Sequence, residues 1–477
     1  SIGGAQAAIV ELPIYRTLQR KMFRILLAVA SCTATISELD DCLHCSTPDV
    51  SLLQVNLELG QRKLEHAAPR EHRWPDSGET YRQQLRNSAD THYLAEITVG
   101  NQTIKGILDT GSFDLVVTSN RCWMCVAVTS SYNPDTSPTF IAGDGAVHTS
   151  AYGSGVLIDT LAYDDVQIGD GLFVAEKQPF YMVIGHMMPI MLGADFAAVI
   201  GMGRTGVSQQ INNSTEAALP ESFHPITRQF SHCLGREPGS PGWWIWHDPI
   251  PANAVSLDMK ALYFWATDMN QTRMSNGIDL GCGSGCAVIF DSGTSLITAP
   301  ASVVNAIDAE LERLDADCTN YDILPDLEFS LDGKDFRLPP ESYIGFVYGE
   351  IDPSLAALMT PPTMKCRALL MKLDIDSQFG PGWILGMPFF KEYYTTFASN
   401  ATRDGGDKVF TTPAGDDCYP SSGTALTEVG RTSGKAGEAM PRRRAKSQLR
   451  RIAAHTIRAP PWMIKAAAKG GKTRMTL

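Results

Sequence analysis

A membrane span requires an apolar run of roughly 20 residues. The sequence contains no apolar run of about that length, so we expect no membrane span. It also lacks the H-E-x-x-H pattern of zinc peptidases and the G-x-S-x-G pattern of α/β-hydrolases. Basic residues are scarce in most of the chain. Residues 419–477 hold 13 of the 40 Lys and Arg but two of the 52 Asp and Glu, which leaves 27 basic and 50 acidic residues before them. A body this acidic excludes nucleic-acid binding by the core.

The composition that is present favours a globular, turn-rich β protein. Hydrophobic residues make up 44% of the chain, and its 41 glycines and 28 prolines suit short strands and turns better than long helices. A length of 477 residues allows two lobes of ordinary size with flanking segments. The clearest expected helix is 301–314, where Val303, Val304, Ile307 and Leu311 share one face.

Two short stretches of similar composition stand 182 residues apart: Asp109–Ser112 reads D-T-G-S and Asp291–Thr294 reads D-S-G-T. Each follows an apolar run and turns at a glycine, which tolerates the backbone angles of a tight turn. One such stretch is common by chance, because these are ordinary turn residues. The repeat in the same context predicts two related lobes that each lend one carboxylate to a shared site.

Asp109 and Asp291 are the candidate catalytic groups. Two aspartates at about 3 Å cannot both ionise comfortably, so they share one proton and provide both a base for water and an acid for a carbonyl oxygen. Peptide-bond hydrolysis without a metal or a nucleophilic side chain needs such a pair. The flanking residues are expected to support the loops: Thr110 and Ser292 by locking the turns together, Ser112 and Thr294 by holding the carboxylates, and Gly111 and Gly293 at the turns.

From about Tyr93 to Pro413 the chain resembles a pepsin-like aspartic endopeptidase. Besides the two aspartate loops, the segments that carry the resemblance are Tyr93–Ile97, Ala151–Gly155, Ala198–Gly201, Cys282–Cys286 and Trp383–Gly386. Tyr152 falls 43 residues after Asp109, where the family places the tyrosine of its flap hairpin. The resemblance implies a mostly β, bilobal fold with two related β lobes and the cleft between them. It also implies that Tyr152, Gly153 and Ser154 close over the substrate.

The sequence departs from the family pattern at two positions. Val116 stands where the family usually has a tryptophan that hydrogen-bonds the flap tyrosine, and Ser154 replaces the usual flap threonine. Because the valine side chain donates no hydrogen bond, we expect the closed flap to be less ordered.

The eleven cysteines suit a disulfide-bonded protein. Cleavage of a signal near Ala34 would remove Cys32 and leave an even set of ten. Local spacing favours Cys122–Cys125 and Cys282–Cys286, and the resemblance adds Cys318–Cys366. Partners for Cys42, Cys45, Cys233 and Cys418 stay open. The C-x-x-C pairs stand too far apart for a zinc ribbon, so we expect no metal.

The chain divides into five expected parts. Residues 1–34 hold upstream sequence and a signal peptide starting at Met22, for which a buried apolar strand is the alternative. Residues 35–92 are expected to be a prosegment or a linker. The N-terminal catalytic lobe spans 93–240, and the C-terminal lobe spans 241–418, with 235–251 as the connection. Residues 419–477 form a basic, disordered tail, in which 442–458 could make a short helix.

The sequence therefore predicts an aspartic endopeptidase that hydrolyses proteins or peptides and is made as a zymogen. We expect no cofactor, no nucleic acid and a monomer, with the basic tail as a possible contact for anionic surfaces. The expected location is the secretory pathway, followed by secretion or an acidic vacuolar or lysosome-like compartment. Sequons, including the one at Asn101, predict a glycoprotein. The alternative is a catalytically silent protein of this fold that binds or inhibits other proteins.

Overall fold

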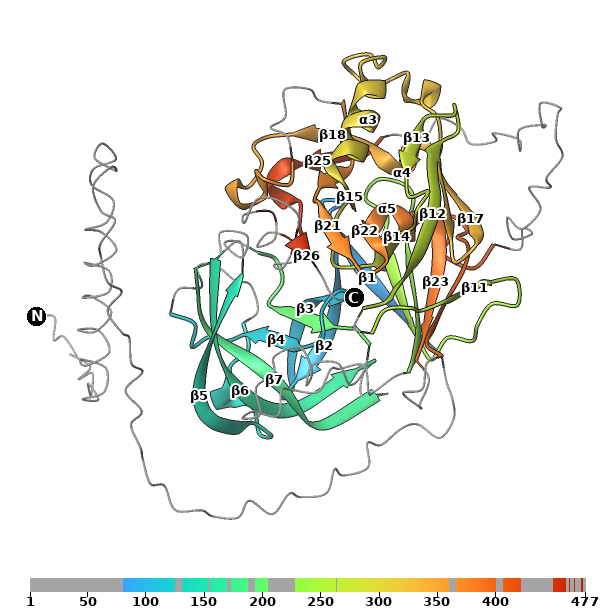
Figure 1. Ribbon diagram of the computed structural model, residues 1–477. Coiled ribbons are helices and arrows are strands. Elements are labelled where there is room, and N and C mark those ends of the chain that lie inside the picture. Colours follow the sequence, from blue (N-terminus) through green and yellow to red (C-terminus); the bar gives the residue numbers. More distant parts are fainter. Residues whose placement is uncertain are drawn as a thin grey trace, which may run out of the picture. The chain divides into compact units, whose positions relative to one another are not determined.

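The computed structural model describes residues 80–123, 125, 131–152, 155–169, 173–187, 194–204, 228–262, 264–359, 366–399, 406–421, 449–459, 463, 467 and 473–474. The expected signal peptide and nearly all of the expected prosegment lie outside the described residues. Within them, strands dominate, so the expected mostly β, bilobal architecture is confirmed (Figure 1).

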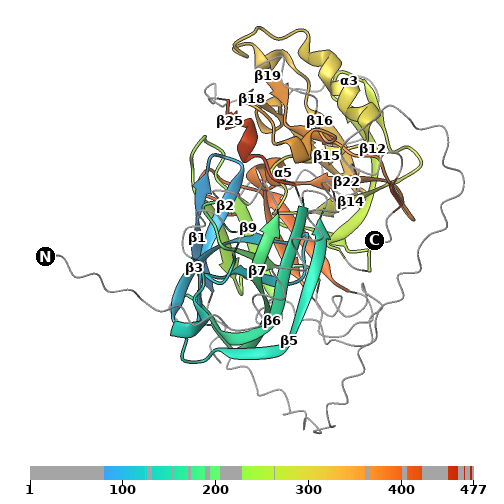
Figure 2. The ribbon, with the colours of Figure 1, turned by 90° about the vertical axis from the view of Figure 1, so that its left-hand side faces the viewer.

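The N-terminal lobe is built on one antiparallel-rich sheet in which neighbouring strands run β1-β2-β3-β8-β4-β7-β6-β5. Its strands are β1 (Tyr81–Ser88), β2 (His92–Val99), β3 (Gln102–Asp109), β4 (Leu115–Thr118), β5 (Ile141–Tyr152), β6 (Gly155–Ile168), β7 (Phe173–Met187) and β8 (Ala198–Gly201). β5, β6 and β7 are the longest of them, and they lie at the end of the fold opposite to the C-lobe helix α3 (Ala301–Leu311) in both views (Figure 2).

The same sheet continues through strands from both halves of the chain, in the order β11-β24-β23-β9-β10-β1. The added strands are β9 (Gln229–Leu234), β10 (Gly242–Trp246), β11 (Val255–Asp258), β23 (Tyr393–Ala398) and β24 (Lys408–Pro413). Aromatic rings fill its buried face: Phe230 stacks on Trp244 with centroids 4.7 Å apart and on Phe397 at 5.0 Å. This shared sheet joins the two lobes through one apolar core.

The C-terminal lobe has its own large sheet, with the order β17-β16-β12-β14-β22-β15-β20 and with β13, β21 and β26 off this path. Its strands are β12 (Ala266–Met274), β13 (Asp279–Gly281), β14 (Cys286–Phe290), β15 (Ile297–Ala299), β16 (Leu327–Leu331), β17 (Lys334–Leu338), β20 (Leu370–Lys372), β21 (Ile375–Ser377), β22 (Gly380–Leu385) and β26 (Thr473–Arg474). A smaller sheet contains β19 (Cys366–Ala368), β18 (Ile344–Tyr348) and β25 (Arg451–Ala453).

Helices are short throughout the described part of the chain. They are α3, α4 (Pro340–Tyr343), α5 (Met387–Glu392) and the 3-10 turns η1 (Pro134–Thr136), η4 (Tyr321–Ile323), η5 (Pro353–Leu355) and η6 (Ala454–Thr456). The helix expected at 301–314 is present as α3, and its expected face (Val303, Val304, Ile307 and Leu311) is buried. Among the described residues, no helix is long and apolar enough to cross a membrane.

Strand pairing differs from two of the expected boundaries. β1 lies within the segment 35–92 that was expected to be a prosegment or linker, and it pairs with both β10 and β2. The lobe boundary at 240/241 falls inside the β9–β10 hairpin, whose strands belong to one sheet. These strands are defined by long-range pairing, which local composition does not show.

Residues 449–459 also differ from the expectation of a disordered tail after residue 419. Residues 451–453 form the strand β25, which pairs in parallel with β18, and Ile452 is 1% exposed. In its described part, 449–458, the short helix expected at 442–458 is replaced by β25 and the three-residue 3-10 turn η6. An available strand edge and an apolar surface override the local helix preference of a segment rich in Arg and Ala.

Candidate active site

Each candidate aspartate stands at the end of a buried strand. Asp109 is the last residue of β3, and Asp291 directly follows β14, which is buried along its whole length. The exposed fractions are 6% for Asp109 and 0% for Asp291. Two strands anchored in different sheets therefore carry one carboxyl each into the interior.

The same arrangement of strands surrounds both aspartates. β3 pairs in parallel with β8, and β14 pairs in parallel with β22. The strand after each aspartate loop, β4 or β15, lies antiparallel against the other side of β8 or β22. The backbone at Gly201 lies so close to the loop after Asp109 that an added Cβ atom would meet the backbone of Phe113. This close approach explains the glycine that ends β8.

The two loops are tied together by hydrogen bonds between Thr110 and Ser292. The Thr110 amide donates to Ser292 Oγ at 3.0 Å, and the Ser292 amide donates to Thr110 Oγ1 at 2.9 Å. Each hydroxyl then donates to a carbonyl of the other strand: Thr110 to Phe290 at 2.9 Å, and Ser292 to Leu108 at 2.7 Å. These four bonds cross between the lobes and fix the relative position of the aspartates.

The carboxyls of Asp109 and Asp291 lie close together. A Cβ atom at Gly111 would meet the carboxylate of Asp291, and one at Gly293 would meet that of Asp109. Each aspartate also accepts a hydrogen bond from the glycine of its own loop, at 2.9 Å from Gly111 and 2.8 Å from Gly293. Any larger residue at the two glycines would separate the acids.

Burial raises the pKa of both carboxyls above the usual aspartate value. The pKa of Asp291 is raised further by the negative charge of Asp109 beside it. Because two such close groups titrate as a pair, one proton is retained on the pair over a wide pH range. One oxygen can then accept a proton while another donates one.

The outer positions of the two loops are not equivalent. Thr294 Oγ1 donates a hydrogen bond to Asp291 Oδ2 at 2.7 Å, as expected from the sequence. Ser112 lies close enough to Asp109 to lower its pKa, but its buried hydroxyl makes no hydrogen bond of good geometry with the described residues. Asp109 is therefore held less tightly on this side than Asp291.

The expected flap hairpin is formed by β5 and β6, in which Tyr152 pairs with Gly155. Gly153 and Ser154, which stand between these two strands in the sequence, lie outside the described residues, as does the side chain of Tyr152. The closing function assigned to these residues therefore stays a prediction.

Val116 lies on β4 opposite Tyr181 of β7 and Val199 of β8. Its side chain is half-buried against a small apolar cluster built on Leu157 and Val183. The half-buried Cys122 and Cys125 pack on the same cluster. The valine thus has its own packing partners, which occupy the space beside it.

All three expected disulfides are present: Cys122–Cys125, Cys282–Cys286 and Cys318–Cys366. A fourth joins Cys233 of β9 to Cys418, 185 residues later. Sequence spacing could not reveal this pair, because it depends on β9 and β23–β24 being neighbours in the shared sheet. Cys42 and Cys45 lie outside the described residues.

A ring nitrogen of His186 and the sulfurs of Cys122 and Cys125 lie within 4.8 Å of one another. Zinc is bound by thiolate sulfur, whereas these two sulfurs are joined in a disulfide. The group is therefore not suited to a metal in this form.

Two further carboxyls, of the half-buried Asp114 and the buried Asp159, were not singled out from the sequence. Burial raises the pKa of Asp114 to about 6, and burial together with the charge of Asp114 raises that of Asp159 to about 7. One carboxylate oxygen of each is buried without a hydrogen-bond donor among the described residues. Their burial results from strand packing, so no local motif marks them.

Comparisons with known proteins agree with this geometry. The chain is 29% identical over 384 residues to cathepsin D of Clupea harengus, covering 75% of this chain and 90% of that protein. It is 31% identical over 346 residues to renin-2 of Mus musculus, covering 67% and 80%. The sequence profile of the eukaryotic aspartyl protease family matches residues 92–405, a span that includes both aspartate loops and the flap hairpin. The chain therefore belongs to the eukaryotic aspartyl protease family.

Proposed function

We propose that this protein is an aspartic endopeptidase in which Asp109 and Asp291 hydrolyse peptide bonds. The observation that carries the proposal is the contact of two buried carboxyls, one from each lobe, whose pKa values are raised and coupled. A pair of acids that shares one proton supplies both a general base and a general acid.

In the proposed reaction, the ionised carboxylate of the pair takes a proton from a water molecule. The resulting hydroxide attacks the carbonyl carbon of the scissile peptide, and the protonated carboxyl gives its proton to the carbonyl oxygen. As the pair takes a proton back from one hydroxyl of the tetrahedral intermediate, the C–N bond breaks, and the amine leaves with the other proton of the pair. The bonds between Thr110 and Ser292 keep the two acids in place throughout.

The proposed substrates are proteins or peptides held in extended form, with Tyr152, Gly153 and Ser154 closing over them. The four disulfides among the described residues support passage through an oxidising compartment such as the secretory pathway. Secretion or delivery to an acidic compartment are both compatible with this route.

We further propose that the protein is made as a latent precursor. Because β1 belongs to the sheet, the candidate prosegment is shortened to residues 35–79, which include Arg62, Lys63, Arg70 and Arg73. At neutral pH the chain starting at Thr35 should be less active than the chain starting at Thr80. The two activities should converge in acid, because cleft carboxylates are then protonated. Equal activity at every pH, with no cleavage of the longer chain, would exclude latency.

The test of the main proposal is hydrolysis of a denatured protein from acid to neutral pH, with and without pepstatin. Asp109→Asn and Asp291→Asn should each abolish turnover, while Asp335→Asn, at an exposed position on β17, should not. Activity should fall as pH rises and the shared proton is lost. Turnover by folded Asp109→Asn or Asp291→Asn would refute the mechanism. An inactive native chain that still binds proteins would support the silent alternative.

A further inference from the structure

The chain returns to the C-lobe after the end of the family match at residue 405. β25 extends the small sheet: Arg451, Ile452 and Ala453 lie opposite Phe346, Val347 and Tyr348 of β18. The Phe346 amide donates to the Arg450 carbonyl at 2.8 Å. We refer to residues 449–459 as the C-terminal segment.

Apolar side chains hold the C-terminal segment against the body. Ile452, Ala454 and Ile457 are at most 1% exposed and belong to one buried cluster. That cluster also contains Leu296, five residues after Asp291, and the half-buried Phe113, four residues after Asp109, packs on it. The segment therefore fills apolar space that adjoins both catalytic loops.

The backbone of the segment binds the second catalytic loop directly. Ser295 follows the D-S-G-T stretch, and its amide donates to the Arg458 carbonyl at 3.1 Å. In return, the Arg458 amide donates to Ser295 Oγ at 2.8 Å. Ile457, just before Arg458, has an extended backbone with φ −63° and ψ 136°. An extended chain that exchanges hydrogen bonds with a strand or loop is also how proteins bind peptides.

The charge of Arg458 acts on both lobes. Its guanidinium is attracted to Asp352 of the C-lobe and to Asp195 of the N-lobe. Asp195 also accepts hydrogen bonds at 2.7–2.8 Å from the side chains of Ser88, Arg86 and His92. Burial lowers the pKa of His92, and the charge of Arg458 lowers it further, so Arg458 lies near this N-lobe group. The segment thus interacts electrostatically with a carboxylate of each lobe.

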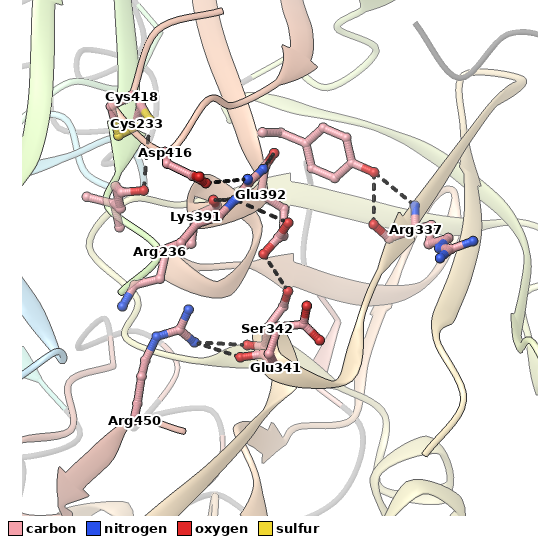
Figure 3. A network of polar contacts seen from close by, with 12 residues as sticks. Cys233, Arg236, Arg337, Glu341, Ser342, Lys391, Glu392, Asp416, Cys418 and Arg450 are labelled. Carbon is pink, nitrogen blue, oxygen red and sulfur yellow. Dashed lines mark hydrogen bonds and ion pairs between the residues drawn. A yellow bond between two sulfur atoms is a disulfide. The ribbon is translucent and has the colours of Figure 1, made fainter. Parts of the chain in front are cut away.

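Arg450 anchors the other end of the segment. It is 5% exposed, and its guanidinium donates to the carbonyls of Glu341 and Ser342 at 3.4 and 3.3 Å (Figure 3). The figure places it beside the network in which Glu392 accepts a hydrogen bond from Ser342 Oγ at 2.8 Å. The segment is therefore fixed at Arg450, along β25 and at Arg458.

We propose that the C-terminal segment occupies part of the substrate-binding position beside Asp291 and competes with peptide substrates as an intramolecular inhibitor. This inference rests on the proposed protease function, because it assigns the segment to the cleft of that enzyme. The charge distribution favours the docking, since the C-terminal segment carries three arginines and no acid, whereas the residues before 419 hold 50 acidic and 27 basic residues. Substrate then binds only when the segment leaves, which raises KM and leaves kcat unchanged.

The first test uses point variants of the full chain. Arg458→Gln removes the attraction to Asp195 and Asp352, so KM for a peptide substrate should fall at least threefold with kcat retained. Arg451→Gln is the matched control, because it removes the same charge from an exposed side chain of the same segment. An unchanged KM in folded Arg458→Gln would overturn the inference.

The second test removes the segment after folding. A recognition site for a sequence-specific protease is inserted between residues 421 and 449, the folded chain is cut, and a synthetic peptide of residues 449–463 is added back. Competitive inhibition by this peptide, weaker with Arg458→Gln in the peptide, supports the inference. Mixed inhibition, or none, overturns it.

Amide hydrogen exchange distinguishes failure of the inference from failure of the proposed function. Pepstatin binding to the native chain, which requires no turnover, should speed exchange at Phe346 as Arg450 leaves. Pepstatin binding without this change overturns the inference alone. A chain that neither hydrolyses protein nor binds pepstatin, intact or cut, overturns the proposed function and the inference with it.

Discussion

Thr110 and Ser292 lie 182 residues apart in sequence, yet the backbone amide of each donates to the hydroxyl of the other, at 3.0 and 2.9 Å. Both side chains are buried, at 0% and 4% exposure. These hydrogen bonds join the two halves of the chain directly, and they set the distance between Asp109 and Asp291.

Thr110→Val should therefore damage both stability and activity. Valine keeps the shape of threonine but leaves the Ser292 amide and the Phe290 carbonyl buried without their partner, which costs about 2–4 kcal/mol. We expect this loss in urea unfolding, together with a lower kcat as the two acids move apart. Thr103→Val, at an exposed position of β3, is the control and should stay within about 0.5 kcal/mol of the parent. An unchanged stability for Thr110→Val would mean that the cross-lobe bonds are not formed in solution.

Asp159→Asn should change how stability depends on pH. The pKa of Asp159 is raised to about 7 in the folded chain, so the folded state binds this proton more tightly than the unfolded state. Its contribution is complete below about pH 4, the unfolded pKa, and is lost as pH rises through 7. The parent should lose stability between pH 4.5 and 7.5, and Asp159→Asn should lose about 2–4 kcal/mol less over that range.

Thermal unfolding of the two proteins across this pH range checks the prediction. Asp335→Asn removes an exposed carboxyl and should leave the slope as it is in the parent. Parallel slopes for the parent and Asp159→Asn would show that Asp159 is ionised at no cost in the folded chain.

Removing the Cys233–Cys418 disulfide should destabilise the protein more than removing Cys122–Cys125. The first closes a loop of 185 residues and the second a loop of three. Chain-entropy estimates give about 5 kcal/mol for the long loop and about 2 kcal/mol for the short one. Paired Cys→Ala variants compared in urea should show this order, and the reverse order would point to native strain or residual unfolded structure as the deciding term.

Val116→Trp should destabilise the protein. The space beside Val116 is filled by Leu157, Val183 and the Cys122–Cys125 pair, so an indole enters only by displacing them, at a cost of about 1–3 kcal/mol. We expect a lower Tm and no gain in kcat/KM. Val116→Ile, a smaller enlargement, is the control and should cost less. Unchanged stability with higher activity would show that the pocket accepts an indole and that the flap gains from it.

The sequence by itself determined the two aspartates, the glycines beside them and the bilobal β class. These depend on short repeated motifs, because a tight turn that presents a carboxylate requires specific residue types within a few positions. Three of the four described disulfides followed from close spacing or from the family pattern. The face of α3 followed from its helical period.

Tertiary structure alone decided the features that depend on distant segments meeting. The sequence of β1 predicts part of a leader, and only its pairing with β10 assigns it to the sheet. The disulfide partner of Cys233 is identified only by the folded chain, in which β9 and β23–β24 are neighbours. The C-terminal segment reads as a basic tail, yet the edge of β18 and an apolar surface beside Ser295 make residues 451–453 a strand and bury Ile452. Local composition reports only the preferences of a segment, whereas strand pairing and burial depend on the surface that the rest of the chain presents to it.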